Sequence, residues 1–216
     1  LALHVPLRDI LLWATLPGAL CVALALSLRE PDDGVAANPA LPDWTWRGLS
    51  KPFRRMLAAI AIFTLGQASN AFVILRAHEL GMPAAQSALL WAAVAATSTL
   101  LAVPLSAHSD RVGRVPLLTI GWALHAVLFV GLGWVGDAGL LWVAAFLLGV
   151  YMAATEGSER ALIADLVRPE RLGTAYGWYY LVKGLLLLPA SAVFGWLWFA
   201  AGAAAAFTVA ASFVAL

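Results

Sequence analysis

The chain alternates between long apolar segments and short clusters of charged residues. Six stretches contain no Asp, Glu, Lys or Arg, namely residues 10–28, 56–75, 84–105, 115–136, 138–155 and 184–216. A helix of roughly 20 residues, rising about 1.5 Å per residue, crosses the hydrocarbon core of a bilayer. The last stretch is too long for one crossing, and a break around 196–202 divides it. The pattern therefore predicts seven transmembrane helices, at 10–28, 56–75, 84–105, 115–135, 139–162, 173–195 and 199–216.

The composition supports a membrane protein and excludes several other classes. Of the 216 residues, 62% are apolar and only 12% are charged, whereas an ordinary soluble domain has about 25% charged residues. A closed β-barrel would show short alternating segments, which do not occur here. The net charge of +1 gives no electrostatic footprint for nucleic acid. The predicted fold class is an all-α polytopic helix bundle in a lipid bilayer, in which the single Cys21 is a small packed side chain.

The basic residues predict the orientation of the helices. Alternate connections, at 29–55, at 106–114 and between residues 160 and 171, hold ten Lys and Arg residues, whereas the connections between them hold only Arg76. Loops rich in Lys and Arg stay in the cytoplasm. We therefore expect a multi-pass protein of the cytoplasmic membrane, with loops 29–55, 106–114 and 163–172 on the cytoplasmic side.

The longest connection indicates a division into domains. Within residues 29–55, the part before Leu49 combines five prolines and glycines with four acidic residues, as is typical of a linker. We expect residues 1–28 to hold the last helix of an N-terminal bundle that is missing from this sequence. Residues 29–55 are then a central cytoplasmic linker, and residues 56–216 form a C-terminal bundle of six helices.

One of the predicted cytoplasmic loops carries a recognisable motif. Residues 106–115 read S-A-H-S-D-R-V-G-R-V. They resemble the signature G-x-x-x-D-[RK]-x-G-[RK]-[RK] of the major facilitator superfamily at Asp110, Arg111, Gly113 and Arg114, but Ser106 replaces the first glycine and Val115 the last basic residue. The stretch D-L-V-R-P-E-R-L-G-T-A-Y-G, starting at residue 165, is similar to a second stretch of the family.

This resemblance covers nearly the whole chain and implies how it works. The predicted spans correspond to the sixth to twelfth helices of a twelve-helix transporter, in which two bundles rock around a central site. The motif residues Asp110, Arg111, Gly113 and Arg114 are then a gating loop. Gly113 permits a tight turn, Asp110 can cap a helix N-terminus, and the two arginines can pair with acidic groups or lipid phosphates. A solvated basic loop without a gating role is the alternative.

A lysine inside a predicted span is the strongest candidate for a site. Lys183 is the eleventh residue of the span 173–195, and Tyr176, Tyr179 and Tyr180 precede it by seven, four and three residues, so the four side chains share one helix face. Charged groups at this depth are costly. An ammonium beside phenolic hydroxyls can bind an anionic group of a substrate or release its proton. A structural ion pair with a neighbouring helix is the alternative.

The preceding span supplies three more charges. Glu156 and Arg160 are four residues apart, as in an ion pair on a helix surface, and Glu159 lies beside both. We expect Glu159 and Arg160 to join a cytoplasmic charge network with Arg111 and Arg114. Glu156 lies deepest and is the candidate for a proton-coupling carboxylate or for the partner of Lys183.

Polar residues of two other spans complete the candidates. Gln67 and Asn70 share a face and suit either a polar cavity lining or hydrogen bonds between helices. His125 lies at the centre of the fourth span, where a neutral, packed histidine is favoured over a proton relay.

These observations predict a secondary transporter. It moves a small molecule by alternating access, powered by a proton gradient, with export by proton antiport as the first expectation. Its expected partners are the small molecule, the proton, the lipid bilayer and the N-terminal half. No enzyme motif, metal cluster or cofactor-binding loop is present in the sequence, so neither an enzyme nor a cofactor is predicted. A seven-helix receptor or photoreceptor is the main alternative, although its retinal lysine would be expected in the last helix.

Overall fold

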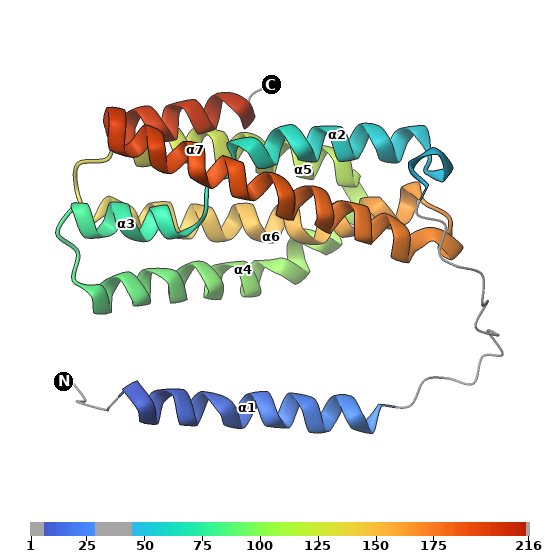
Figure 1. Cartoon of the computed structure of the whole chain (residues 1–216), viewed down its shortest axis with the longest axis horizontal. Coiled ribbons are helices and arrows are strands. Elements are labelled where there is room, and N and C mark those ends of the chain that lie inside the picture. Colours follow the sequence, from blue (N-terminus) through green and yellow to red (C-terminus); the bar gives the residue numbers. More distant parts are fainter. Residues whose placement is uncertain (1–6, 29–44, 215–216) are drawn as a thin grey trace. The chain divides into compact units, whose positions relative to one another are not determined.

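The computed structural model describes residues 7–28 and 45–214, and helices dominate both ranges (Figure 1). In chain order the elements are α1 (Leu7–Ser27), the 3₁₀ turn η1 (Trp46–Gly48), α2 (Lys51–Gly66), α3 (Ala71–Glu79), α4 (Ala84–Val112), α5 (Arg114–Trp134), α6 (Leu140–Leu166), the 3₁₀ turn η2 (Pro169–Arg171) and α7 (Leu172–Val214). No strand occurs in the described residues. The predicted all-α class is confirmed.

The chain forms two compact units, Leu1–Leu41 and Pro42–Leu216. The first unit contains α1, whose 21 residues include Pro17 and Cys21, the latter exposed. The predicted domain boundaries stay a prediction, and residues 29–44 of the expected linker lie outside the described residues. The linker was expected to run to residue 55, but α2 already begins at Lys51. Ser50 explains this start, because its hydroxyl accepts a hydrogen bond from the amide of Phe53 at 3.2 Å and so caps the helix.

The helices of the second unit run back and forth (Figure 1). Helix α6 packs against α4 and α5, and α7 packs against α2 and α5. One end of this bundle collects the first residues of α2, the α4–α5 turn and the α6–α7 turn, and we call it the basic end because most of the unit's Lys and Arg residues lie there. Those residues are Lys51, Arg54, Arg55, Arg111, Arg114, Arg168 and Arg171. The opposite end is called the far end.

The predicted span 56–75 is not one continuous helix. Helix α2 ends at Gly66, Gln67 leaves the helical conformation with φ −90° and ψ 96°, and α3 begins at Ala71. Gly66 packs directly against the carbonyl of Ala210, where any side chain would collide with the backbone. The sequence prediction missed this break, because the segment contains neither a proline nor a run of glycines to signal it.

The predicted break at 196–202 occurs at Gly202. This residue has φ 84° and ψ 171°, a conformation that side chains strongly disfavour, and it divides α7 into arms 172–201 and 203–214. The second arm turns back along the bundle (Figure 1), and Gly133 of α5 packs against Ala204 and Phe207 at its start.

Among the residues that the structure describes, five helical segments are long and apolar enough to cross a membrane: Lys51–Glu79, Ala84–Val112, Arg114–Trp134, Leu140–Leu166 and Pro169–Val214. Seven spans were predicted. Pro169–Val214 contains both arms of α7 and so holds two of the predicted spans, and the predicted span 10–28 falls in α1, whose 21 residues belong to the first unit.

Two apolar clusters hold the second unit together. One, towards the far end, surrounds the completely buried Phe207 and includes Phe129 and Leu148. The other, at the basic end, includes Phe53 and Ile163. Large apolar side chains also face outward, and Phe199 is 93% exposed. Outward apolar side chains are expected where lipid is the solvent.

Candidate functional site

The site is built between α6 and the first arm of α7, from Glu159, Tyr179 and Lys183. The Nζ atom of Lys183 donates to Oε2 of Glu159 at 2.9 Å and to the hydroxyl of Tyr179 at 3.1 Å. The hydroxyl of Tyr179 donates to the same Oε2 at 2.5 Å. One carboxylate oxygen therefore receives both a cationic and a phenolic donor.

The three side chains of this site differ in how far they are buried. The side chain of Glu159 is only 2% exposed and Tyr179 only 3%, whereas the side chain of Lys183 keeps 27% exposed. A buried carboxylate is very costly unless it is paired and hydrogen-bonded. The four-residue spacing of Tyr179 and Lys183 places the ammonium 5.1 Å from the centre of the tyrosine ring. The arrangement is a preformed charge pair whose cationic side remains accessible.

The structure corrects the predicted partner of Lys183. Glu159, not Glu156, contacts the ammonium, while Glu156 pairs with Arg160 at 3.4 Å with both side chains about half exposed. The expected network of Glu159 and Arg160 with the motif arginines is also wrong. The carboxylate of Glu159 is buried in the bundle, where it accepts hydrogen bonds from Tyr179 and Lys183 of α7.

The three tyrosines have different roles. Tyr179 alone contacts the ion pair, whereas Tyr176 donates its hydroxyl to the carbonyl of Arg160 at 2.9 Å. Tyr180 is 56% exposed and touches Tyr179 through its ring. Side chains on one face of a helix still point in somewhat different directions. The shared face of the three tyrosines and Lys183 therefore did not bring all of them to the same ion pair.

A second polar contact lies at the break between α2 and α3. Gln67 donates its side-chain amide to the hydroxyl of Tyr151 at 3.2 Å, and Tyr151 is 5% exposed. Asn70 is exposed at the start of α3 and does not cap it with its side chain. The sequence alone does not single out Tyr151 as a polar contact, because a tyrosine within an apolar run has the same pattern as a core residue.

His125 packs within an aromatic group. Its ring centre lies 4.0 Å from that of Phe129, 4.4 Å from that of Tyr151 and 5.4 Å from that of Phe63. Among the described residues neither ring nitrogen has a hydrogen-bond partner. This arrangement agrees with a packed histidine.

The predicted gating loop forms the turn between α4 and α5. Gly113 has φ 103°, which explains the need for glycine there. Arg114 pairs with Asp165 of α6 at 2.6 Å and lies 3.6 Å from Asp110. Asp110 lies in the last turn of α4 and caps no helix N-terminus, contrary to expectation, and Arg111 is exposed. The ion pair between Arg114 and Asp165 therefore connects the motif loop to the second stretch that resembles the family, which begins at Asp165.

A further polar cluster closes the far end. Arg76 pairs with Glu79 at 3.0 Å and donates to the carbonyl of Val135 at 2.6 Å. The indole of Trp198 donates to Glu79 at 2.8 Å. These contacts, which we call the Glu79 cluster, connect α3 with the α5–α6 connection and with α7.

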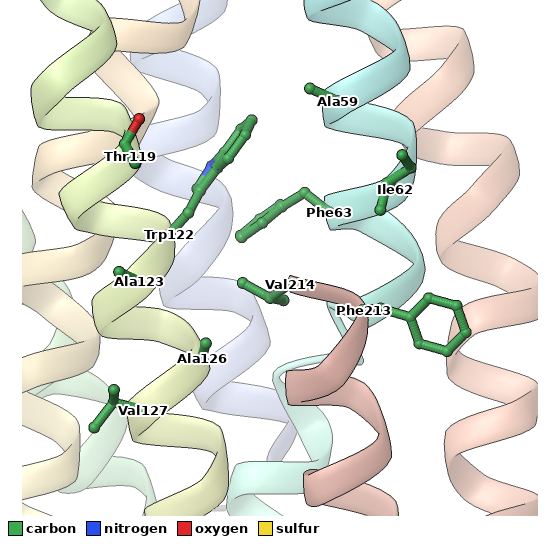
Figure 2. Close-up of a pocket in the computed structure, with 10 residues that line it drawn as sticks. All are labelled: Ala59, Ile62, Phe63, Thr119, Trp122, Ala123, Ala126, Val127, Phe213 and Val214. Atoms are coloured by element: carbon green, nitrogen blue, oxygen red, sulfur yellow. The ribbon is translucent and has the colours of Figure 1, made fainter. Parts of the chain in front are cut away.

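A pocket of about 590 Å³ lies between α2, α5 and the end of α7 (Figure 2). Figure 2 shows Phe63 and Trp122 facing each other across it, with ring centres 4.8 Å apart, while Phe213 points away. None of its ten lining residues is charged, so this pocket has no group that can handle an ion. Within the described residues, no group of three or more His, Cys, Asp or Glu side chains could hold a metal.

Comparison with known proteins gives a consistent result. A family model described as Major Facilitator Superfamily matches residues 55–216. The chain is 30% identical over 158 residues to an uncharacterised MFS-type transporter of Methanocaldococcus jannaschii, covering 70% of this chain and 40% of that protein. It is 26% identical over 197 residues to an uncharacterised protein of Mycobacterium tuberculosis, covering 85% of this chain and 46% of the relative. The chain thus spans less than half the length of the curated relatives it matches.

Proposed function

Because the chain belongs to the major facilitator superfamily, we propose that it is part of a secondary transporter that moves a small molecule across a membrane by alternating access. The observation that carries the proposal is the contact between Lys183 and the buried Glu159. Its partners are the small molecule, the proton, the bilayer and an N-terminal bundle. The family match favours this function over a receptor or an enzyme.

The chemistry of the pair supports coupling between a proton and a cargo. With Glu159 ionised, the ammonium of Lys183 is neutralised at 2.9 Å. A proton taken up by Glu159 removes that negative charge and leaves Lys183 cationic, so an anionic group of the cargo can replace the carboxylate. Tyr179, hydrogen-bonded to both, holds the two groups in place. The exposed part of Lys183 is the side from which the cargo enters.

This arrangement favours an anionic cargo that travels with the proton. Export by proton antiport, expected from the sequence, requires instead that cargo and proton compete for one group. The two modes predict opposite effects of a pH gradient, since co-transport accumulates cargo on the side to which protons flow and antiport depletes it there.

The break at Gln67–Asn70 adds polar groups to the same proposal. Discontinuous helices in transporters expose backbone groups that contact substrates. Gln67 contacts Tyr151 on α6, the helix that also carries Glu159. We assign Gln67 and Asn70 to the path of the cargo, with α3 as the half-helix that moves around the break.

The loop at the basic end serves as the gate in this proposal. Arg114 bridges Asp110 and Asp165 and thereby joins the ends of α4, α5 and α6. Opening this side requires the bridge to loosen. We expect Asp110→Asn to slow turnover more than it weakens cargo binding, and equal effects on both would contradict gating.

A flux assay tests the proposed function. The full-length protein is reconstituted into vesicles and offered a panel of small anions and other metabolites, with and without a pH gradient. For a transported compound, Glu159→Gln should abolish accumulation driven by the gradient but retain exchange of cargo across the membrane, because the amide mimics the protonated acid. The matched control, Glu156→Gln, should retain both activities. Wild-type accumulation by Glu159→Gln would remove Glu159 from proton coupling.

A further inference from the structure

The accessible side of Lys183 has an exposed aromatic ring beside it. Tyr180 lies three residues before Lys183 on α7 and is 56% exposed. The ring of Tyr179 lies between the two groups, with its centre 5.1 Å from Nζ of Lys183 and 4.9 Å from the centre of the Tyr180 ring. The two tyrosine rings meet edge to face, at 70°. An exposed ring is therefore held one ring away from the cation of the ion pair.

Two glycines leave space next to this ring. Gly177 and Gly184 lie three residues before and four residues after Tyr180, so each is one helical turn away on the same side of α7. A side chain at either glycine would meet no atom within 4 Å. The surface of α7 beside the Tyr180 ring is thus open in both directions along the helix.

The depth of Tyr180 in the bundle argues against a role as a headgroup anchor. It lies nine residues beyond Arg171, which corresponds to about 13 Å along the helix from the basic end. Tyrosines that anchor a helix lie at the ends of its span, at the level of the headgroups. A phenolic hydroxyl that faces hydrocarbon finds no hydrogen-bond partner and is costly there. This cost, and that of the accessible Lys183 nearby, favours an internal, hydrated face for this side of α7.

We propose that the cargo is a small anion with a planar aromatic body, namely an aromatic carboxylate. The inference rests on the proposed function, because the cargo must replace Glu159 as the partner of Lys183. The carboxylate then binds the ammonium, and the aromatic ring packs against Tyr180 in the open space beside Gly184. Aromatic rings with centres 4.5–7 Å apart attract each other beyond the effect of buried area. Tyr180 is therefore the residue that selects an aromatic cargo over an aliphatic one.

The test compares two acids of equal charge and similar size on the purified full-length protein. Equilibrium dialysis measures the affinity for radiolabelled benzoate and for radiolabelled cyclohexanecarboxylate. Both the wild type and Glu159→Gln are used, because the amide of the variant leaves the ammonium of Lys183 free for the ligand. Benzoate should bind about three- to tenfold more tightly than cyclohexanecarboxylate, as expected for one added aromatic pair.

Three variants of exposed aromatic residues assign the preference to one ring. Tyr180→Leu should weaken benzoate binding about three- to tenfold and change cyclohexanecarboxylate binding less than about twofold. Tyr180→Phe keeps the ring and should retain the preference. Phe199→Leu removes an exposed ring from the same arm of α7 and should change neither affinity. A preference for benzoate that survives Tyr180→Leu would overturn the proposal.

A pair of glycine variants tests the position of the bound ring. Gly184→Leu fills the open space beside Tyr180, and it should weaken benzoate binding at least about threefold because the aromatic contact is blocked. Gly131→Leu adds the same side chain to α5, where a side chain likewise meets no atom within 4 Å, and should leave the affinity unchanged. Equal effects of the two variants would overturn the placement of the cargo beside Tyr180.

The outcomes separate this inference from the proposed function. Equal affinity for the two acids, together with flux of an aliphatic anion in the vesicle assay, would overturn the aromatic cargo and retain the transporter. Binding of neither acid, by the wild type or by Glu159→Gln, would overturn the aromatic cargo as well. Absence of flux for every compound of the panel would overturn the proposed function and this inference with it.

Discussion

Two carboxylates of this chain have the same kinds of partner in very different surroundings. Glu159 receives hydrogen bonds from a cation, Lys183, and from an aromatic donor, Tyr179. Glu79 likewise receives them from Arg76 and Trp198. The side chain of Glu79 is 37% exposed at the far end, whereas that of Glu159 is 2% exposed inside the bundle. Similar hydrogen bonds therefore have different energetic consequences.

Solvent accounts for the difference. An exposed ion pair gains little because water already solvates both groups, and salt screens what remains. A buried charge that loses its partner has no water to replace it. The comparison teaches that Lys183 and Glu159 depend on each other in a way that Arg76 and Glu79 do not, so a change of partner at Glu159 can drive a change of conformation.

The largest effect is expected for Lys183→Met. This change leaves Glu159 buried without its cation, and the free energy of unfolding should fall by about 3 to 5 kcal/mol. Denaturant titration of the purified protein in micelles measures it. The double variant Lys183→Met/Glu159→Met should recover most of the loss, because no charge is left unpaired. A loss below about 1 kcal/mol in the single variant would show that the pair is solvated like the Glu79 cluster.

A smaller loss is expected for Tyr179→Phe. The change removes one hydrogen bond to an ionised group and keeps the ring, and such a bond contributes about 1.5–3 kcal/mol. The same titration, carried out beside Tyr180→Phe, provides the comparison, since the exposed Tyr180 gives no hydrogen bond to Glu159. Equal losses in the two variants would contradict the proposed strength of the contact at Glu159.

At the far end, Glu79→Gln should cost only about 0.2–1 kcal/mol. The amide oxygen still accepts the hydrogen bond from Trp198, and only the ion pair with Arg76 is lost. Repeating the measurement in about 1 M salt should abolish the difference between this variant and the wild type. A loss that persists in high salt would mean that the far end is shielded from water as Glu159 is.

The smallest effect is expected for Glu156→Gln, on the same helix as Glu159. Its pair with Arg160 has four-residue spacing and both side chains are about half exposed, so the expected loss is about 0.3–0.5 kcal/mol. Thermal unfolding of Glu156→Gln and Lys183→Met, measured in parallel, compares the smallest and the largest expected loss of stability. A larger loss for Glu156→Gln than for Lys183→Met would reverse the assignment of the buried carboxylate.

The helical class and the family could be predicted from the sequence, because each depends on a local signal, the length of the apolar segments or a loop motif. A charge within a span likewise marked Lys183 as a candidate, and its role stays a prediction. The partner of Lys183 depends on how α6 is rotated towards α7. Glu156 and Glu159 are one helical turn apart, and their spacing to Arg160 favoured neither for the interior. The break after Gly66 was equally hidden, since its cause, the approach of Ala210, is remote in sequence. Local patterns identify the elements and their charges, whereas packing decides which charges meet.

Transport by the charge-free double variant Lys183→Met/Glu159→Met tests the central claim most directly. A purely structural ion pair can be replaced by apolar side chains of similar volume without loss of function. If the pair handles the cargo and the proton, as proposed, the double variant should reach the membrane in wild-type amount and yet transport nothing. Wild-type flux by this variant, measured in the same vesicles, would contradict the account.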